Sequence, residues 1–159
     1  MNDDEKYMKT AIEEARKSVK ADGAPIGAVM VKDGEAIATG QSLVWTKKDP
    51  SCHGEIECMR NACQKLQTLD LSGCILYSTL EPCSMCLGCA GWTGLSEIVF
   101  GAYQEDIPEN PYELAGYHAK EHAKRLTPLS GQKVKVCGGV LRDECKDLMK
   151  NIRQWSLVE

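Results

Sequence analysis

Two short motifs constrain this chain more than any other feature of its sequence. Residues 53–55 read His-Gly-Glu, and residues 82–86 read Pro-Cys-Ser-Met-Cys. Imidazole nitrogen and thiolate sulfur are zinc ligands. A structural zinc site takes four protein ligands, whereas a catalytic site takes three and leaves one position for water. The motifs therefore predict a catalytic zinc site in which Glu55 moves a proton of that water, and the predicted ligands are His53, Cys83 and Cys86.

The spacing within each motif is compatible with two helix starts that meet at one metal ion. Cys83 and Cys86 are three residues apart, so they share one face of a helical turn. Pro82 is expected as the first residue of that helix, where proline is tolerated. The positive end of a helix favours thiolate over thiol. His53 is expected just before a second helix, with Glu55 in its first turn.

Apolar periodicity and turn residues predict helices and strands that alternate along the chain. Residues 41–51 are expected to form a loop, with Asp49-Pro50 as a breaker. The order of a helix, a hairpin and then alternating elements predicts a mixed sheet flanked by helices. The expected helices are 4–19, 55–66, 84–91, 113–126 and 141–154, and the expected strands are 26–31, 35–40, 74–79, 97–101 and 133–137.

Composition narrows the class of protein. The chain has 159 residues, of which 43% are hydrophobic, so we expect residues 1–159 to form a single domain. The formal net charge of −4 disfavours tight nonspecific binding to nucleic acid. The sequence contains no apolar stretch of about 18 residues, so a membrane partner is not expected. The acidic start and the nine cysteines predict a cytoplasmic protein with reduced thiols.

Three other interpretations of the cysteines stay open at this point. A Cys-x-x-Cys pair is also typical of thioredoxin-like redox sites, although this would leave His53 and Glu55 without a task. A closed structural zinc site would need a fourth ligand, and either Cys89 or Cys52 could supply it. The Cys-x-x-Cys-x-x-Cys run also has the spacing of some iron–sulfur sites.

The combined pattern resembles the cytidine-deaminase-like superfamily of zinc deaminases, whose signature is His-x-Glu followed by Pro-Cys-x-x-Cys. It is most similar to the branch that holds bacterial guanine deaminases, fungal-type cytosine deaminases and bacterial tRNA adenosine deaminases. The resemblance also includes residues 24–28 and 76–86 and covers most of the chain. It implies a three-layer α/β/α sandwich around a mixed five-stranded sheet and a homodimer. It further implies one Zn²⁺ per subunit, with Glu55 as the proton shuttle.

Within this branch the sequence favours a free nucleobase or nucleoside as the substrate. Gly54 resembles the fungal-type cytosine deaminases, because the tRNA enzymes usually have alanine there. Residues 40–42, Asp49-Pro50 and the long stretch 102–136 resemble the guanine deaminases. Trp92 matches a tryptophan that guanine deaminases use near the base. The expected substrate-binding residues are Ser42, Gly54, Trp92 and Trp45.

Two departures from the family pattern leave the particular base open. The relatives typically have an asparagine that contacts the substrate where this chain has Ser42. The guanine deaminases also have an acidic residue that reads the base, and residues 114–118 contain no carboxylate at the matching point, although Glu113 is close. Another amino-substituted heterocycle therefore stays open as the substrate.

Several residues have a second interpretation. Trp45 could stack on a substrate or lie at a subunit contact, and Trp92 could pack in the core or at a dimer contact. His118 and His122 could form a second metal pair, but a solvated helix face is favoured, and His118 could also line the pocket. The alternative function, tRNA adenosine deamination, would need a basic surface formed by Lys47, Lys48, Lys120, Lys124 and Arg125.

Overall fold

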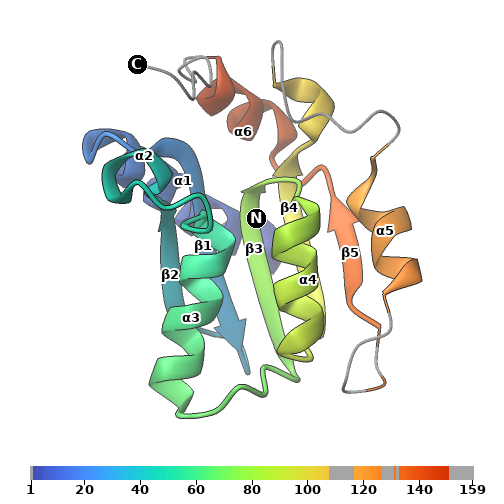
Figure 1. Ribbon diagram of the computed structural model, residues 1–159. Coiled ribbons are helices and arrows are strands. Elements are labelled where there is room, and N and C mark those ends of the chain that lie inside the picture. Colours follow the sequence, from blue (N-terminus) through green and yellow to red (C-terminus); the bar gives the residue numbers. More distant parts are fainter. Residues whose placement is uncertain (1, 108–116, 127–130, 132, 151–159) are drawn as a thin grey trace.

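The computed structural model describes residues 2–107, 117–126, 131 and 133–150 (Figure 1). Most of the expected elements are present within these residues. In chain order the elements are α1 (Asp3–Lys20), β1 (Ala24–Lys32), β2 (Glu35–Ser42), α2 (Val44–Lys47), α3 (Gly54–Leu66), β3 (Cys74–Leu80), α4 (Ser84–Trp92), β4 (Glu97–Ala102), the 3-10 helix η1 (Gln104–Asp106), α5 (Ala119–Arg125), β5 (Lys135–Gly138) and α6 (Arg142–Met149).

The described strands form a five-stranded sheet in the order β2-β1-β3-β4-β5. Strand β1 pairs antiparallel with both β2 and β3, whereas β3, β4 and β5 run parallel. The turn at Asp33 and Gly34 connects β1 to β2, and both residues have a positive φ. A parallel connection needs a crossover, which α4 provides between β3 and β4. The expected mixed sheet is therefore confirmed.

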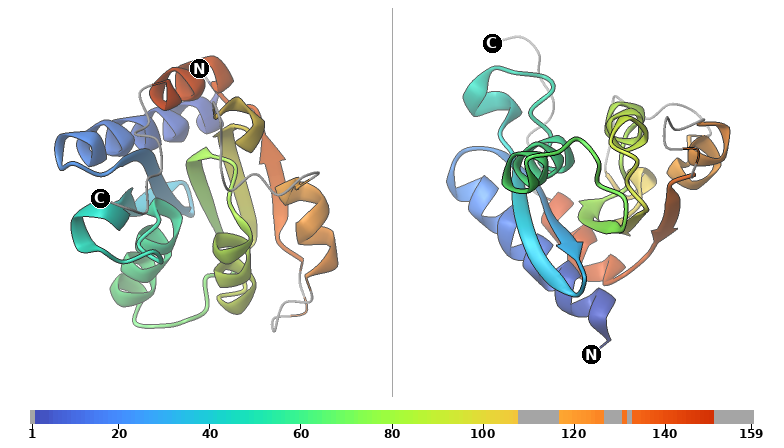
Figure 2. Two further views of the ribbon diagram at one scale, coloured as in Figure 1. Left: turned by 45° about the horizontal axis from the view of Figure 1, so that its top comes forward. Right: turned by 90° about the horizontal axis from the view of Figure 1, so that it is seen from below.

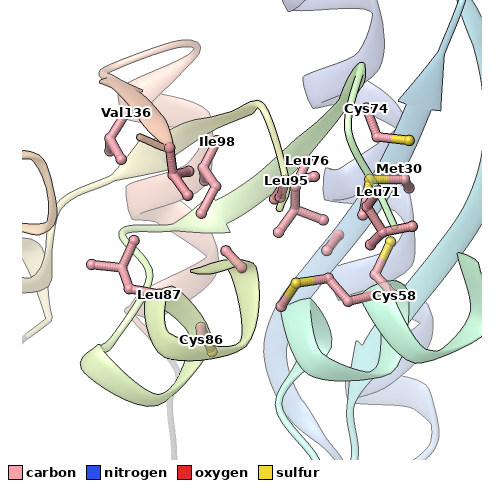
Figure 3. Packing of buried hydrophobic residues seen from close by; sticks show 14 of the residues in the cluster. Met30, Cys58, Leu71, Cys74, Leu76, Cys86, Leu87, Leu95, Ile98 and Val136 are labelled. Carbon is pink, nitrogen blue, oxygen red and sulfur yellow. The ribbon is translucent and has the colours of Figure 1, made fainter. Parts of the chain in front are cut away.

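Helices cover both faces of this sheet. Figure 2 shows α1 and α6 on one face, and α3, α4 and α5 on the other. Alternate residues of each strand point to opposite faces. Leu76 and Ile98 therefore pack under α3, α4 and α5, whereas Tyr77 and Val99 pack under α1 and α6. Figure 3 shows the first of these two clusters, with side chains of α3 and α4 facing the strands. The expected three-layer α/β/α architecture is confirmed.

Two glycines let helices approach the sheet at backbone distance. A Cβ atom at Gly27 would lie 2.2 Å from the nitrogen of Ala15 in α1. A Cβ atom at Gly40 would lie 2.1 Å from the carbonyl oxygen of Gly54, the first residue of α3. Because carbon cannot approach these atoms so closely, only glycine fits at either position. Gly40 thus helps to set where α3 begins, and with it the position of His53.

Some expected boundaries were wrong. The expected loop 41–51 contains α2, a single turn too short to show helical periodicity. The C-cap of α2 is Lys48, whose φ is 52°. Pro82 lies outside α4, because Cys83 takes the N-cap position.

Two of the expected helices begin later than predicted, and β5 is displaced. Helix α5 begins at Ala119, so Tyr117 and His118 precede it, and residues 113–116 of the expected helix lie outside the described residues. Leu141 is the N-cap of α6, and residues 151–154 of that expected helix also lie outside. Strand β5 covers Lys135–Gly138 rather than 133–137. In the described part of the chain, no helix has the length and hydrophobicity needed to cross a membrane.

Candidate metal centre and active site

The three predicted ligands meet at the starts of two neighbouring helices. His53 is the N-cap of α3, Cys83 is the N-cap of α4, and Cys86 lies in the first turn of α4. The His53 Nδ1 atom lies 3.8 Å from the Cys83 Sγ atom and 3.7 Å from the Cys86 Sγ atom. The two sulfur atoms are 3.5 Å apart. The fold thus brings together residues that are 30 positions apart in the sequence.

These distances fit a tetrahedral zinc ion. Zinc bonds of about 2.3 Å to sulfur and about 2.0 Å to nitrogen give sulfur–sulfur edges of about 3.8 Å and sulfur–nitrogen edges of about 3.6 Å. The observed separations are close to those edges. They are also far from a disulfide bond, in which the sulfur atoms are about 2.05 Å apart, and Cys83 and Cys86 are free thiols.

The described residues do not supply a fourth ligand. Among them, His53, Cys83 and Cys86 form the one group of potential ligand residues whose donor atoms all lie close together, within 4.8 Å. Neither Cys89 nor Cys52 belongs to this group. The geometry therefore favours the three-ligand arrangement over a closed structural site.

The pKa values of the two thiols, Cys83 and Cys86, are shifted in opposite directions. Hydrogen bonding with Cys86 lowers the pKa of Cys83 to about 4, and the neighbouring His53 acts in the same direction. The same hydrogen bond, together with burial, raises the pKa of Cys86 well above its ordinary value. A thiolate at Cys83 and a neutral imidazole at His53 are the forms that bind a metal. Without an ion, the Cys83 thiolate is the favoured one of these two forms. Burial lowers the pKa of His53, but its hydrogen bond with Cys83 and the charge of Glu55 raise it overall, which opposes the neutral imidazole, so metal binding has to displace protons.

Glu55 lies in the first turn of α3 and is 2% exposed. Its Oε2 atom has no hydrogen-bond partner among residues 2–107, 117–126, 131 and 133–150. Burial raises its pKa to about 7, while the charge of His53 opposes this shift. A carboxyl group with a pKa near 7 can both accept and donate a proton at neutral pH. Because buried polar atoms are usually paired, an unpartnered oxygen at this place indicates that it serves a ligand or a reaction.

Ser42 and Gly54 lie next to each other at the start of α3. Ser42 ends β2, is 1% exposed and also has an unpartnered Oγ atom. A Cβ atom at Gly54 would lie 3.5 Å from the Ser42 nitrogen and 3.1 Å from the Ile26 oxygen. Among the described residues, Ser42 Oγ and Glu55 Oε2 are the two buried side-chain oxygens without a partner. Both belong to residues that the sequence analysis selected.

The two predicted tryptophans are placed differently. Trp45 lies in α2, where it is partly buried and packs against the cluster under α1 and α6. Trp92 is the last residue of α4 and is 74% exposed. It lies about 9 Å along the helix axis from Cys86. The structure therefore does not bring Trp92 to the metal centre within one chain, and the substrate role of both tryptophans stays a prediction.

Two residues near the centre, Glu81 and Tyr117, have no role predicted from the sequence. Glu81 follows β3 directly and is 2% exposed, and its Oε1 atom accepts a hydrogen bond from the Ala119 N–H. The Tyr117 hydroxyl donates a hydrogen bond to the Pro82 carbonyl oxygen at 2.7 Å. For Glu81, the available signal in the sequence was a carboxylate placed between an apolar strand and the Pro-Cys motif. No sequence signal pointed to Tyr117.

The two histidines outside the centre do not form a second metal group with other described residues. His118 is exposed and takes the N-cap position of α5. The His122 ring lies 5.5 Å from the Tyr117 ring, measured between centroids. These positions give no support to a second metal pair.

Comparison with known families identifies the class of protein. The family model for the cytidine and deoxycytidylate deaminase zinc-binding region matches residues 1–102, which is more than half of the chain. The chain therefore belongs to this family of zinc-dependent enzymes that hydrolyse C–N bonds in deamination. The expected superfamily, enzyme class and zinc cofactor are confirmed.

The relatives divide between two activities. Guanine deaminase of Bacillus subtilis is 41% identical over 110 residues, which cover 69% of this chain and 70% of the relative. The tRNA-specific adenosine deaminase of the same organism is 35% identical over 150 residues, which cover 94% of this chain and 93% of the relative. The solved structure of guanine deaminase from Nitrosomonas europaea has a TM-score of 0.78 at 29% identity, covering 92% of this chain and 82% of that one.

Proposed function

We propose that the protein is a zinc-dependent hydrolytic deaminase of a free nucleobase or nucleoside. It replaces an exocyclic amino group by oxygen and releases ammonia. The observation that carries the proposal is the buried Glu55, whose Oε2 atom has no partner in the described part of the chain and whose neighbour His53 belongs to the group of potential metal ligands. His53, Cys83 and Cys86 hold the ion in this scheme.

The chain's own residues perform the proton transfers. When bound, zinc supplies a water whose pKa is lowered toward 7. Glu55 accepts one proton of the attacking water at Oε2 and becomes a neutral carboxylic acid. It then donates that proton to a ring nitrogen of the substrate. Glu55 next takes the proton of the newly added hydroxyl group and passes it to the leaving amino group, so that water is consumed and ammonia is released.

The surroundings of Glu55 support this role. Burial makes electrostatic interactions with the developing charge stronger than they would be in water. The Ser42 hydroxyl is available to bind a polar atom of the substrate, because it has no hydrogen-bond partner among the residues that the structure describes. Gly54 presents backbone rather than a side chain at the start of α3. We propose Ser42 and Gly54 as substrate-binding residues, and Trp45 and Trp92 stay predictions for that role.

Two observations support a small-molecule substrate over RNA. The net charge is −4, and a protein that binds a polyanion normally offers basic surface. The guanine deaminase of Bacillus subtilis has a higher identity, at 41%, than the tRNA enzyme of the same organism, at 35%. A small-molecule substrate also needs no large basic surface near the centre.

A panel assay tests the proposal directly. The zinc-loaded protein would be incubated separately with guanine, cytosine, adenine, their nucleosides, and pterins and triazines that carry an amino group. Released ammonia would be measured in each case. We expect turnover of at least one free base or nucleoside, with Glu55→Gln as the inactive control. Absence of turnover throughout this panel, together with inosine formation in tRNA, would replace the proposal by the second candidate.

The second candidate is a tRNA-specific adenosine deaminase. The observation that favours it is the alignment with the Bacillus subtilis tRNA enzyme, which extends over 94% of this chain, whereas the guanine deaminase alignment extends over 69%. In a dimer, basic residues of α2 and α5 would have to form the RNA surface. A gel-shift experiment with tRNA, in parallel with the panel assay, separates the two candidates. We also propose that the protein is a homodimer, which sedimentation analysis would test.

A further inference from the structure

Glu81 is a buried carboxylate that the proposed reaction does not use. It lies between the end of β3 and the ligand Cys83, and it is 2% exposed. Carboxylates are rarely buried to this degree unless other groups satisfy their oxygens. Here two backbone N–H groups do so. The Gln104 N–H donates to Oε2 at 3.0 Å, and the Ala119 N–H donates to Oε1 at 2.7 Å.

These two amides begin two separate helices. Gln104 is the first residue of η1, and Ala119 is the first residue of α5. The first N–H groups of a helix have no partner within the helix, and negative charge is favourable at that end. One carboxylate thus caps both elements, although they are separated in sequence by residues 107–118.

Further contacts hold the same parts together. The Gln104 side-chain Nε2 atom donates to the Glu81 carbonyl oxygen at 2.6 Å, and the Glu81 N–H donates to the Ala102 oxygen at 2.8 Å. The Tyr117 hydroxyl donates to the carbonyl oxygen of Pro82, the neighbour of Glu81. Two hydrogen bonds, from Ala119 to Glu81 and from Tyr117 to Pro82, therefore form a fastening between residues 117–119 and residues 81–82.

This fastening places Tyr117 next to the metal centre. Its side chain packs against the hydrophobic cluster that contains Cys86, and Cys83 packs against the same cluster. Burial, together with the charges of Cys83 and Glu81, raises the pKa of Tyr117 far above its ordinary value. Because Pro82 directly precedes Cys83, the hydrogen bond from the Tyr117 hydroxyl holds this side chain beside the loop that carries the ligand.

We propose that Glu81 is a positioning residue that holds residues 117–119 against the loop carrying Cys83, so that Tyr117 forms one wall of the substrate pocket. The proposal rests on the proposed deaminase function for its substrate, but the fastening itself does not depend on which substrate is used. Glu81 acts through Tyr117 and touches neither the substrate nor the ion.

Glu81→Gln is the primary test, because glutamine has nearly the same shape but offers one accepting oxygen instead of two. One of the two backbone amides therefore loses its acceptor. We expect faster amide hydrogen exchange in residues 117–126, unchanged exchange in α3, and one zinc per chain. The KM should rise about tenfold, in line with the loss of a hydrogen bond to a charged group, while kcat changes by less than about twofold.

Asp106→Asn is the matched control. Asp106 is also a buried carboxylate that caps η1, since it accepts from the Tyr103 N–H and from Arg142. Within the described part of the chain, its side chain contacts Tyr103, Arg142 and Lys146, and it makes no hydrogen bond or ion pair with residues 117–119. This variant should lose stability, yet retain the wild-type KM and the wild-type exchange of residues 117–126. A merely structural effect of Glu81→Gln would make the two variants behave alike.

Tyr117→Phe provides a second, milder variant in case Glu81→Gln does not fold. It removes the hydroxyl that binds Pro82 and keeps the ring. We expect it to raise both the KM and the exchange of residues 117–126, and the effects of the double variant should be smaller than the sum of the single effects. The cobalt-substituted forms should keep the thiolate-to-cobalt absorption of the wild type, because the ligands stay in place.

Two results would overturn the proposal. One is wild-type exchange of residues 117–126 in both Glu81→Gln and Tyr117→Phe. The other is faster exchange combined with a wild-type KM, which would leave Glu81 a structural role only. If the wild type turns over no free base, the proposed function fails separately. The KM would then be measured with tRNA as the substrate. The amide hydrogen exchange of residues 117–126 would still test whether Glu81 holds residues 117–119 in place.

Discussion

The Nδ1 atom of His53 and the Sγ atom of Cys86 lie 3.7 Å apart, although His53 is the N-cap of α3 and Cys86 lies in the first turn of α4. This separation is close to the edge of a zinc coordination tetrahedron, which is about 3.6 Å between nitrogen and sulfur. The separation of these two atoms depends on the sheet, because α3 packs against β2 at Gly40, whereas α4 is the next element after β3 in the chain. The sheet thus determines how close the potential ligand atoms of the two helices lie.

Glu55→Gln should abolish turnover and preserve the metal centre. Glutamine has almost the same size but cannot take a proton from water at neutral pH, so loss of about 10²–10⁴-fold in kcat is expected from the loss of acid–base catalysis. Zinc content by atomic absorption and ammonia release would be measured on the same sample. Near-full activity of this variant would rule out the shuttle role of Glu55.

Removal of zinc should abolish activity reversibly and lower the thermal stability. A metal that binds only the folded chain stabilises it by mass action, so the metal-free protein should unfold at a lower temperature. Re-addition of zinc should restore both activity and stability, as measured by ammonia release and by calorimetry.

Cys89→Ser distinguishes an open metal centre from a closed one. Cys89 lies outside the group formed by His53, Cys83 and Cys86, so this variant should retain one zinc per chain and wild-type activity. Cys86→Ser should lose zinc under the same conditions. Loss of zinc from Cys89→Ser would instead indicate a four-ligand structural site and contradict the catalytic interpretation.

Ser42→Ala should weaken substrate binding without weakening the fold. The Ser42 hydroxyl is buried and unpartnered, so its removal takes away an unsatisfied polar group and should leave the free energy of unfolding unchanged or slightly higher. If the hydroxyl binds the substrate, the KM should rise about tenfold. Denaturant unfolding and steady-state kinetics would be compared, and an unaltered KM would exclude Ser42 from the binding site.

The stability lost in Asp106→Asn should depend on pH. Hydrogen bonding with Arg142 holds the pKa of Asp106 below its ordinary value of 3.8. A lowered pKa means that this stabilisation is fully present above pH 3.8 and is lost as the pH falls through the folded-state pKa. The variant should therefore be less stable by about 1–2 kcal/mol at pH 7, and the difference should shrink below pH 3.8. A difference independent of pH in urea unfolding would assign the loss to packing.

Local patterns predicted most of the secondary structure, because periodicity and turn residues act over a few residues. They failed for α2, because a single turn is too short to show periodicity. They also failed at the start of α5, where the cause is tertiary. That start is set by the contact of Ala119 with Glu81, which is 38 residues away. A sequence window of the usual length does not contain both partners of such a contact.

The sequence by itself determined the chemistry of the donor set and a mixed sheet flanked by helices, because ligand identity and hydrophobic periodicity are properties of the residues. The roles of the individual site residues are predictions that the proposed experiments address. Only the tertiary structure decided which polar atoms are buried without a partner, such as Ser42 Oγ, and which are paired, such as both oxygens of Glu81. It also decided that Trp92 faces away from the fold. The physical reason is that burial and pairing depend on which distant segments pack together, and the close approach of α3 to β2 at Gly40 is one such contact.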